Sequence, residues 1–142
     1  MYRELAAASP DAFRPYLAGS LNNQSDRLAV LGRREDALSA STEAVQMYRE
    51  LMEQHPVFRE SLAVSLASLG IRLTELDDHY AALSAEREAV AIYTALFPSD
   101  PERYRDSLEQ SVTNLVIHLR NLGYSEQQMA DELDALSLPD VD

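Results

Sequence analysis

The chain has 142 residues with 24 acidic and 12 basic side chains, which give a formal charge of −12 at pH 7. That charge disfavours nucleic acid and membrane surfaces as partners and suits a basic or neutral protein, although simple solvation of a helical surface also explains it. The absence of cysteine excludes disulfides and thiolate metal sites and favours a reducing cytoplasm. No apolar run reaches membrane-spanning length, and the N-terminal segment lacks the apolar core of a signal peptide.

Apolar residues recur at helical spacing throughout the chain, which predicts an all-α fold in a single domain, 1–142, with no strand. Leu62 and Leu66, for example, begin a stripe that continues every three or four positions. In chain order, the expected helices are 1–8, 12–31, 33–54, 58–76, 79–97, 101–122 and 125–136. In the fifth of these, we expect Glu86 and Glu88 to be turned mostly outward, away from the apolar stripe.

The sequence repeats with a period of about 45 residues. The segment at 2–5 recurs at 48–51, and a weaker copy follows in the next unit. Gly32 stands where the later copies have Asp77 and Gly123, a position that suits a left-handed residue ending the first helix of each unit. Prolines recur near the unit boundaries, where a helix start tolerates them: Pro10, Pro56 and Pro101.

The repeat divides the chain into three two-helix units, at 12–54, 58–97 and 101–136. Residues 1–8 align with the end of a second helix, so we expect the chain to begin in mid-repeat and to belong to a longer array. The third unit is the most divergent, as is typical of a terminal cap. The tail at 137–142 has no full counterpart and is expected to fray.

The second unit resembles the tetratricopeptide repeat signature, in which a Leu-Gly pair, a turn and small residues let two helices pack closely. The residues that carry the resemblance are Leu69, Gly70, Asp77, Tyr80, Ala82, Leu83 and Ala89. The first unit has Ser25 and the third has Val116 in place of the glycine. The long period and the segment at 20–23 are similar to the long-unit subclass of kinesin light chains and bacterial repeat proteins. The resemblance implies an α-solenoid of about three antiparallel helical hairpins plus a partial N-terminal helix.

In this family the first helices line a concave groove, and the resemblance places partner-binding positions on the faces that do not carry the packing residues. These positions are Asn22, Asn23, Asp26, Ala29, Val64, Ala67, Ile71, Thr74, Gln110, Thr113, Ile117 and Arg120. Ile71 and Ile117 would offer apolar contact, and Asn22 and Asn23 would hydrogen-bond the backbone of an extended peptide. The alternative is that the isoleucines belong to the core and the amides are merely solvated.

The sequence offers few candidates for catalytic or metal-binding residues. The turn at 77–79 offers two carboxylates and an imidazole to a metal, yet three adjacent turn residues rarely converge on one ion, and a solvated helix cap explains them better. The pairs Glu86 with Glu88 and 131 with 132 are typical of solvated helix faces. His118 replaces an arginine of the other two units. No motif predicts a nucleophile with a base, a phosphate loop or a cofactor.

We therefore expect a non-enzymatic protein–protein interaction module that binds a peptide or partner helix in the concave groove. The clamp that grips a C-terminal carboxylate in some family members is disfavoured, because only Arg120 and Asn23 match it. One alternative is a structural spacer or self-association segment of a longer regulatory protein, which would form a homodimer through exposed end helices. Another is a metal-dependent enzyme built around His79.

Overall fold

The computed structural model describes residues 3–4 and 10–140, which form helices and turns without any strand, so the predicted all-α fold is confirmed. The helices are α2 (Pro10–Val30), α3 (Arg34–Gln54), α4 (Arg59–Glu75), α5 (His79–Leu96), α6 (Pro101–Asn121) and α7 (Glu126–Ala135), with short 3₁₀ segments at Pro56–Phe58 and Phe97–Ser99. Their ends lie within two residues of the predicted positions. The helix expected at 1–8 falls outside the described residues except at Arg3 and Glu4, which are helical.

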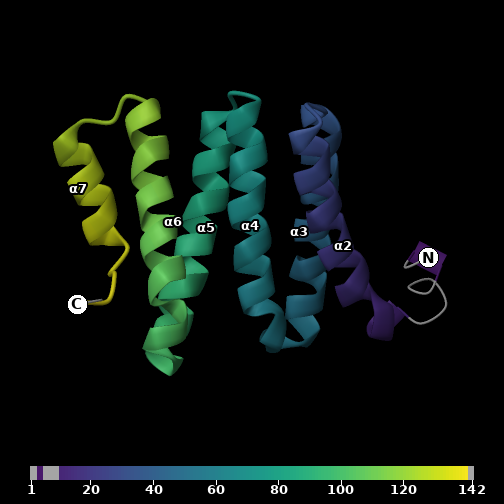
Figure 1. The fold of residues 1–142 in the computed structure, drawn as a ribbon. Coiled ribbons are helices and arrows are strands. Elements are labelled where there is room, and N and C mark those ends of the chain that lie inside the picture. Colours follow the sequence, from purple (N-terminus) through teal and green to yellow (C-terminus); the bar gives the residue numbers. More distant parts are fainter. Residues whose placement is uncertain (1–2, 5–9, 141–142) are drawn as a thin grey trace.

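The helices stack as a row of antiparallel hairpins (Figure 1). The hairpins are α2 with α3, α4 with α5, and α6 with α7. The second helix of each of the first two hairpins also packs extensively against the first helix of the next one, so α3 contacts α4 and α5 contacts α6. The first helices α2, α4 and α6 therefore form one layer and the second helices the other, which is the predicted α-solenoid.

One turn geometry recurs between the two helices of every hairpin. Gly32, Asp77 and Gly123 have positive φ angles of 78°, 60° and 85°. At each turn the positive-φ residue and its successor donate backbone hydrogen bonds to carbonyls three and five positions earlier, as from Arg33 N to Leu28 O at 2.9 Å. These bonds satisfy the last carbonyls of the first helix. The predicted shared turn is confirmed, although Asp77 adopts it at a higher steric cost than glycine.

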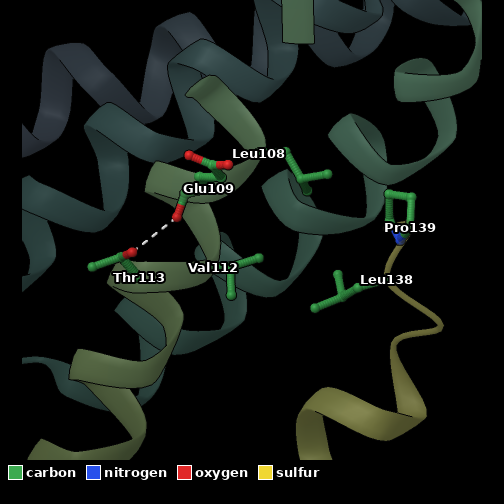
Figure 2. Close-up of a pocket in the computed structure, with 6 residues that line it drawn as sticks. All are labelled: Leu108, Glu109, Val112, Thr113, Leu138 and Pro139. Atoms are coloured by element: carbon green, nitrogen blue, oxygen red, sulfur yellow. Dashed lines mark hydrogen bonds between the residues drawn. The ribbon is translucent and has the colours of Figure 1, made fainter. Parts of the chain in front are cut away.

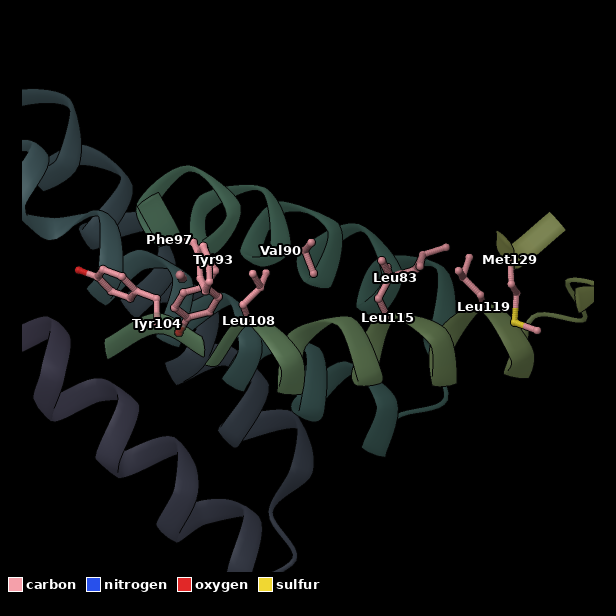
Figure 3. Close-up of a cluster of buried hydrophobic side chains, with 10 residues drawn as sticks. Leu83, Val90, Tyr93, Phe97, Tyr104, Leu108, Leu115, Leu119 and Met129 are labelled. Carbon is pink, nitrogen blue, oxygen red and sulfur yellow. The ribbon is translucent and has the colours of Figure 1, made fainter. Parts of the chain in front are cut away.

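Small side chains on the second helices let the helices of a hairpin approach closely. Ala37 and Ala44 on α3, and Ala82 and Ala89 on α5, are fully buried. Larger side chains then fill the seam between α5 and α6, where each buried residue contributes roughly 1.5–3 kcal/mol relative to exposure. The labelled members of this core in Figure 3 are Leu83, Val90, Tyr93, Phe97, Tyr104, Leu108, Leu115, Leu119 and Met129. This core fixes the position of α6 over α5.

The third hairpin is more open than the first two. Its second helix, α7, has 10 residues, whereas α3 has 21 and α5 has 18, and it packs less extensively on its partner. In the second hairpin, Gly70 allows close packing, and in the first Ser25 donates a hydrogen bond to the Ala37 carbonyl at 2.7 Å. The bulkier Val116 stands at this position in α6, which explains the looser contact.

The chain after α7 folds back onto α6 (Figure 2). Leu138 packs partly buried against the core and, with Pro139, faces Leu108 and Val112 across a hollow of about 390 Å³. We expected this tail to fray, but the short α7 leaves apolar surface on α6, and Leu138 covers part of it. Residues 141–142 of the tail lie outside the described part of the chain.

Ion pairs join successive second helices along the outer layer, and we refer to them as the outer ladder. The pairs are Arg3 with Glu43 of α3 at 3.0 Å, Arg49 of α3 with Glu88 of α5 at 2.6 Å, and Arg87 of α5 with Glu132 of α7. The first two occupy corresponding positions of consecutive repeats. Because all the partners are at least partly exposed, each pair contributes below about 1 kcal/mol, and the ladder mainly favours one register between repeats.

Candidate binding groove between α4 and α6

A groove of about 530 Å³ lies between α4 and α6, with α5 as its floor. Its lining consists of Ala67, Ile71, Thr74 and Glu75 from α4, Glu86 from α5, and Gln110, Asn114, Ile117 and His118 from α6. On each wall, three of these residues are spaced by four and three positions, so each helix presents one row of side chains. We refer to the meeting of α4, α5 and α6 as the second junction, and to that of α2, α3 and α4 as the first junction.

The structure brings part of the predicted site together. The predicted residues that line the groove are Ala67, Ile71, Thr74, Gln110 and Ile117. Val64 and Arg120 are exposed on the same helices but outside the lining, and Thr113 lines the hollow beside the tail. The other predicted residues lie on α2, at the first junction: Asn22, Asn23, Asp26 and Ala29.

Two isoleucines supply the apolar surface of the groove walls. Ile71 is 48% exposed and Ile117 is 44% exposed, whereas the core residue Leu115 of α6 is completely covered. The alternative that the two isoleucines belong to the core therefore does not hold. Exposed aliphatic side chains from two helices that border one hollow provide the contact surface an apolar ligand group needs.

The floor of the groove carries a buried carboxylate. Glu86 is 1% exposed, so the prediction that it faces solvent is wrong. It follows Ala82 by four positions and precedes Val90 by four, which places it on the stripe of α5 that packs inward. Gly70 of α4 leaves room for it, since a β-carbon at that glycine would lie 3.3 Å from the Glu86 Oε2 atom.

Glu86 has little compensation for a buried charge. Ser111 forms a side-chain hydrogen bond with its carboxyl group, but Oε1 has no hydrogen-bond partner among the described residues. Burial disfavours the ionised form and raises the pKa of Glu86 from 4.5 to about 7, against the opposing effect of the Ser111 hydrogen bond. Near neutral pH, the floor of the groove is therefore only partly ionised.

His118 borders the floor from α6. It is 6% exposed, and its Nδ1 atom has no partner in the part of the chain that the structure describes. Burial lowers the pKa of His118 from 6.5, and the nearby His79 lowers it further. The imidazole is therefore mostly neutral at pH 7. The acidic residues that line the groove are Glu75 and Glu86.

The first junction is linked by polar contacts. The Asn22 Nδ2 atom donates a hydrogen bond to Ser65 Oγ at 2.6 Å, between α2 and α4. The buried Arg72 donates to the Ser25 backbone carbonyl at 3.4 Å, and its guanidinium lies 4.0 Å from the Asp26 carboxylate. Asn22 is thus engaged within the protein, and its contact with a peptide stays a prediction.

The turn at 77–79 does not gather into a metal site. The His79 Nε2 atom lies 3.9 Å from Asp77 Oδ1, while Asp78 caps α5 by accepting a hydrogen bond from Ala81 N at 3.2 Å. Over residues 3–4 and 10–140, no group of three or more His, Cys, Asp or Glu side chains is placed to hold a metal ion. Within the same residues, no helix combines the length and apolarity that crossing a membrane requires.

Comparison with known proteins agrees with the repeat architecture. A family model described as tetratricopeptide repeat matches residues 62–102, which include most of α4, all of α5 and the start of α6. The matched stretch is similar to a tetratricopeptide repeat, and the match supports assignment to that family. No curated protein and no solved structure matches the chain. A tetratricopeptide repeat is typical of protein–protein interaction modules.

Proposed function

We propose that the groove between α4 and α6 binds a peptide or helical segment of a protein partner. The observation that carries this proposal is that Ile71 and Ile117, from consecutive repeats, are each nearly half exposed and line the same hollow. Apolar side chains held at the surface by a rigid scaffold are typical of recognition sites. In this proposal the chain acts by holding its partner and performs no catalysis.

The dimensions of the groove suit a short segment. The row from Ala67 to Thr74 covers about two helical turns, or roughly 10 Å at 1.5 Å per residue. An extended peptide of about three or four residues, or about two turns of a partner helix, matches that length. On the opposite wall, the amide of Gln110 donates to Asn114 Oδ1 at 3.1 Å, and the remaining amide capacity is available to a ligand backbone.

A random peptide library displayed on phage tests this function. Wild-type protein should enrich a set of peptides, and combined Ile71→Ser and Ile117→Ser substitution should weaken their binding by roughly tenfold or more, because two apolar contacts are lost. The matched control combines Val30→Ser and Val57→Ser, which change valines that are 88% and 81% exposed outside the groove lining. If the isoleucine variant keeps its helical circular dichroism and binds as tightly as wild type, the groove is not the site.

A self-association segment is the second candidate function. At the end of α2, Val30 is 88% exposed and Leu31 is 72% exposed, and with Asp26 and Arg27 they line a hollow of about 430 Å³. In this alternative the chain is a structural spacer or self-association segment of a longer regulatory protein, and two copies meet through this surface. Sedimentation equilibrium over a wide concentration range measures such contact, and a strict monomer at the highest concentration would exclude it.

We further propose that the chain is one domain with repeat units at 12–54, 58–97 and 101–136, of the long-unit subclass. The recurring turn and the extensive packing between consecutive hairpins support this division, because units that share a core unfold together. Limited proteolysis should cut beyond residue 136 before it cuts between units. Early cleavage between α3 and α4 would contradict a single domain.

A further inference from the structure

We propose that the groove selects a partner segment that carries an arginine or lysine, whose cation pairs with Glu86 while flanking apolar side chains contact Ile71 and Ile117. The inference rests on the proposed function and specifies the ligand chemistry at the same site. Two observations lead to it. One is the buried carboxylate oxygen of Glu86, which lacks a hydrogen-bond partner among the described residues, and the other is the apolar surface on both walls.

The charge balance of the groove favours a cationic ligand. Its lining contains two carboxylates, and neither lysine nor arginine occurs among the described residues that form it. The Glu75 carboxylate already lies 3.6 Å from the guanidinium of Arg72, which also contacts α2. No arginine or lysine of the described residues pairs with Glu86, and the hydrogen bond from Ser111 stabilises its charged form. A cation from a partner would supply the missing compensation.

The position of the carboxylate favours a long basic side chain. Glu86 belongs to the groove lining, but its Oε1 atom is closed to water, so the side chains of the two walls must part for a ligand cation to reach it. Arginine and lysine place their charge at the end of an aliphatic stem, and that stem would lie against Ile71 and Ile117. A charge-assisted hydrogen bond formed away from water is stronger than one at the surface.

Pairing of Glu86 with a cation should release protons. The titratable groups around Glu86 are Glu75 on α4, Tyr93 on α5 and His118 on α6. Burial raises the pKa of Tyr93 and lowers that of His118, so near pH 7 Tyr93 stays protonated and His118 stays mostly neutral. A bound cation lowers the pKa of Glu86 from its value of about 7, so protons leave Glu86 on binding.

Peptides enriched from the phage library on the wild-type protein provide the test. The set should be rich in arginine and lysine, and replacing the key arginine by citrulline, or the key lysine by norleucine, should weaken binding to wild type by roughly tenfold. On Glu86→Gln, the same replacement should change the affinity by less than about twofold. Calorimetry at pH 7 in buffers of different ionisation enthalpy should detect proton release with wild type and none with Glu86→Gln.

The outcomes separate the ligand chemistry from the proposed function. If binding depends on Ile71 and Ile117 but the peptides need no cation, or neutralising the cation weakens binding equally on wild type and Glu86→Gln, the cation proposal is overturned and the groove function stands. If no peptide is enriched, or binding ignores the isoleucines, both proposals fail. Glu86→Gln keeps the shape of the side chain and should fold. Ser41→Ala, at the corresponding position of α3, is the matched control and should keep the cation preference.

Discussion

The two junctions between successive hairpins use corresponding helices but differ in chemistry. At the first junction, Asn22 and the buried Arg72 link α2 to α4. At the second, the corresponding positions carry Ala67 and His118, and both line the groove between α4 and α6. The same backbone arrangement therefore supports a closed contact in one place and a ligand-sized hollow in the next. A few side chains decide which junction is available to a partner.

Replacing the buried carboxylate of Glu86 by a neutral amide is expected to have the largest effect on stability. Between pH 4.5 and about 7 the folded protein binds more protons at Glu86 than the unfolded chain does, so the stability contributed by this group falls as pH rises through that window. The free energy of unfolding of Glu86→Gln minus that of wild type should therefore increase by roughly 3 kcal/mol between pH 4 and pH 8. Urea unfolding at both pH values measures this, and a difference that does not change with pH would contradict the raised pKa. Ser41→Ala at the first junction is the control and should show no such dependence.

A substitution that makes the first junction resemble the second should have the next largest effect on stability. Arg72→His removes a buried guanidinium that reaches the Ser25 carbonyl, and the shorter imidazole cannot replace that contact. We expect a loss of about 2 kcal/mol in the free energy of unfolding, measured by urea denaturation at pH 8. The control, Arg27→His, changes the corresponding but exposed residue of α2 and should alter stability by less than about 0.5 kcal/mol. Equal effects of the two substitutions would remove the distinction between the junctions.

Removing the polar link between α2 and α4 should have a smaller effect. Asn22→Ala, which introduces the side chain found at position 67, deletes the hydrogen bond to Ser65. We expect the free energy of unfolding, measured by heat or urea denaturation, to fall by about 1 kcal/mol. The neighbouring Asn23 is exposed, so Asn23→Ala should change stability by less than about 0.5 kcal/mol. A loss confined to Asn23→Ala would show that the link is not formed.

The smallest effect is expected at the turn of the hairpin that both junctions share. Asp77 has φ 60°, a conformation that glycine adopts without the steric cost of a side chain. The left-handed conformation costs a residue with a side chain about 1–2 kcal/mol, which exceeds the roughly 0.4–1 kcal/mol of entropy that glycine gains in the unfolded chain. Asp77→Gly should therefore raise the free energy of unfolding by about 0.5 kcal/mol. Peptide affinity should stay unchanged, because the turn lies outside the groove lining. Lower stability, measured by thermal unfolding, would contradict this account of the turn.

The architecture was predictable because its signals occur several times. Gly32, Asp77 and Gly123 mark the same turn in three copies, and each copy supports the interpretation of the others. The alternation of apolar helical stripes with these turns then predicts the order of the helices and where each one ends. A single copy would have left the fold ambiguous, because one amphipathic helix pair is compatible with several architectures.

The floor of the groove was not predictable in the same way. Glu86 lies beside Arg87 and Glu88, a charged run that suggests solvent, yet α6 packs over this part of α5 and covers it. The spacing of four positions between Ala82 and Glu86 was the signal in the sequence that Glu86 faces inward. A stripe defined by apolar residues alone does not include a glutamate. Ile71 lies off the packing stripe, as the sequence indicated. Its contact with a partner stays a prediction, because a sequence does not show which surface a ligand covers.

The outer ladder runs in one direction. In each of its pairs the arginine lies on the earlier helix and the glutamate on the later one. α7 takes part in the last of these pairs through Glu132 and carries neither arginine nor lysine. It therefore has no cation to offer the glutamate of a further helix, and the ladder stops at this hairpin. A helix stacked beyond α7 would have to be held in register by other contacts.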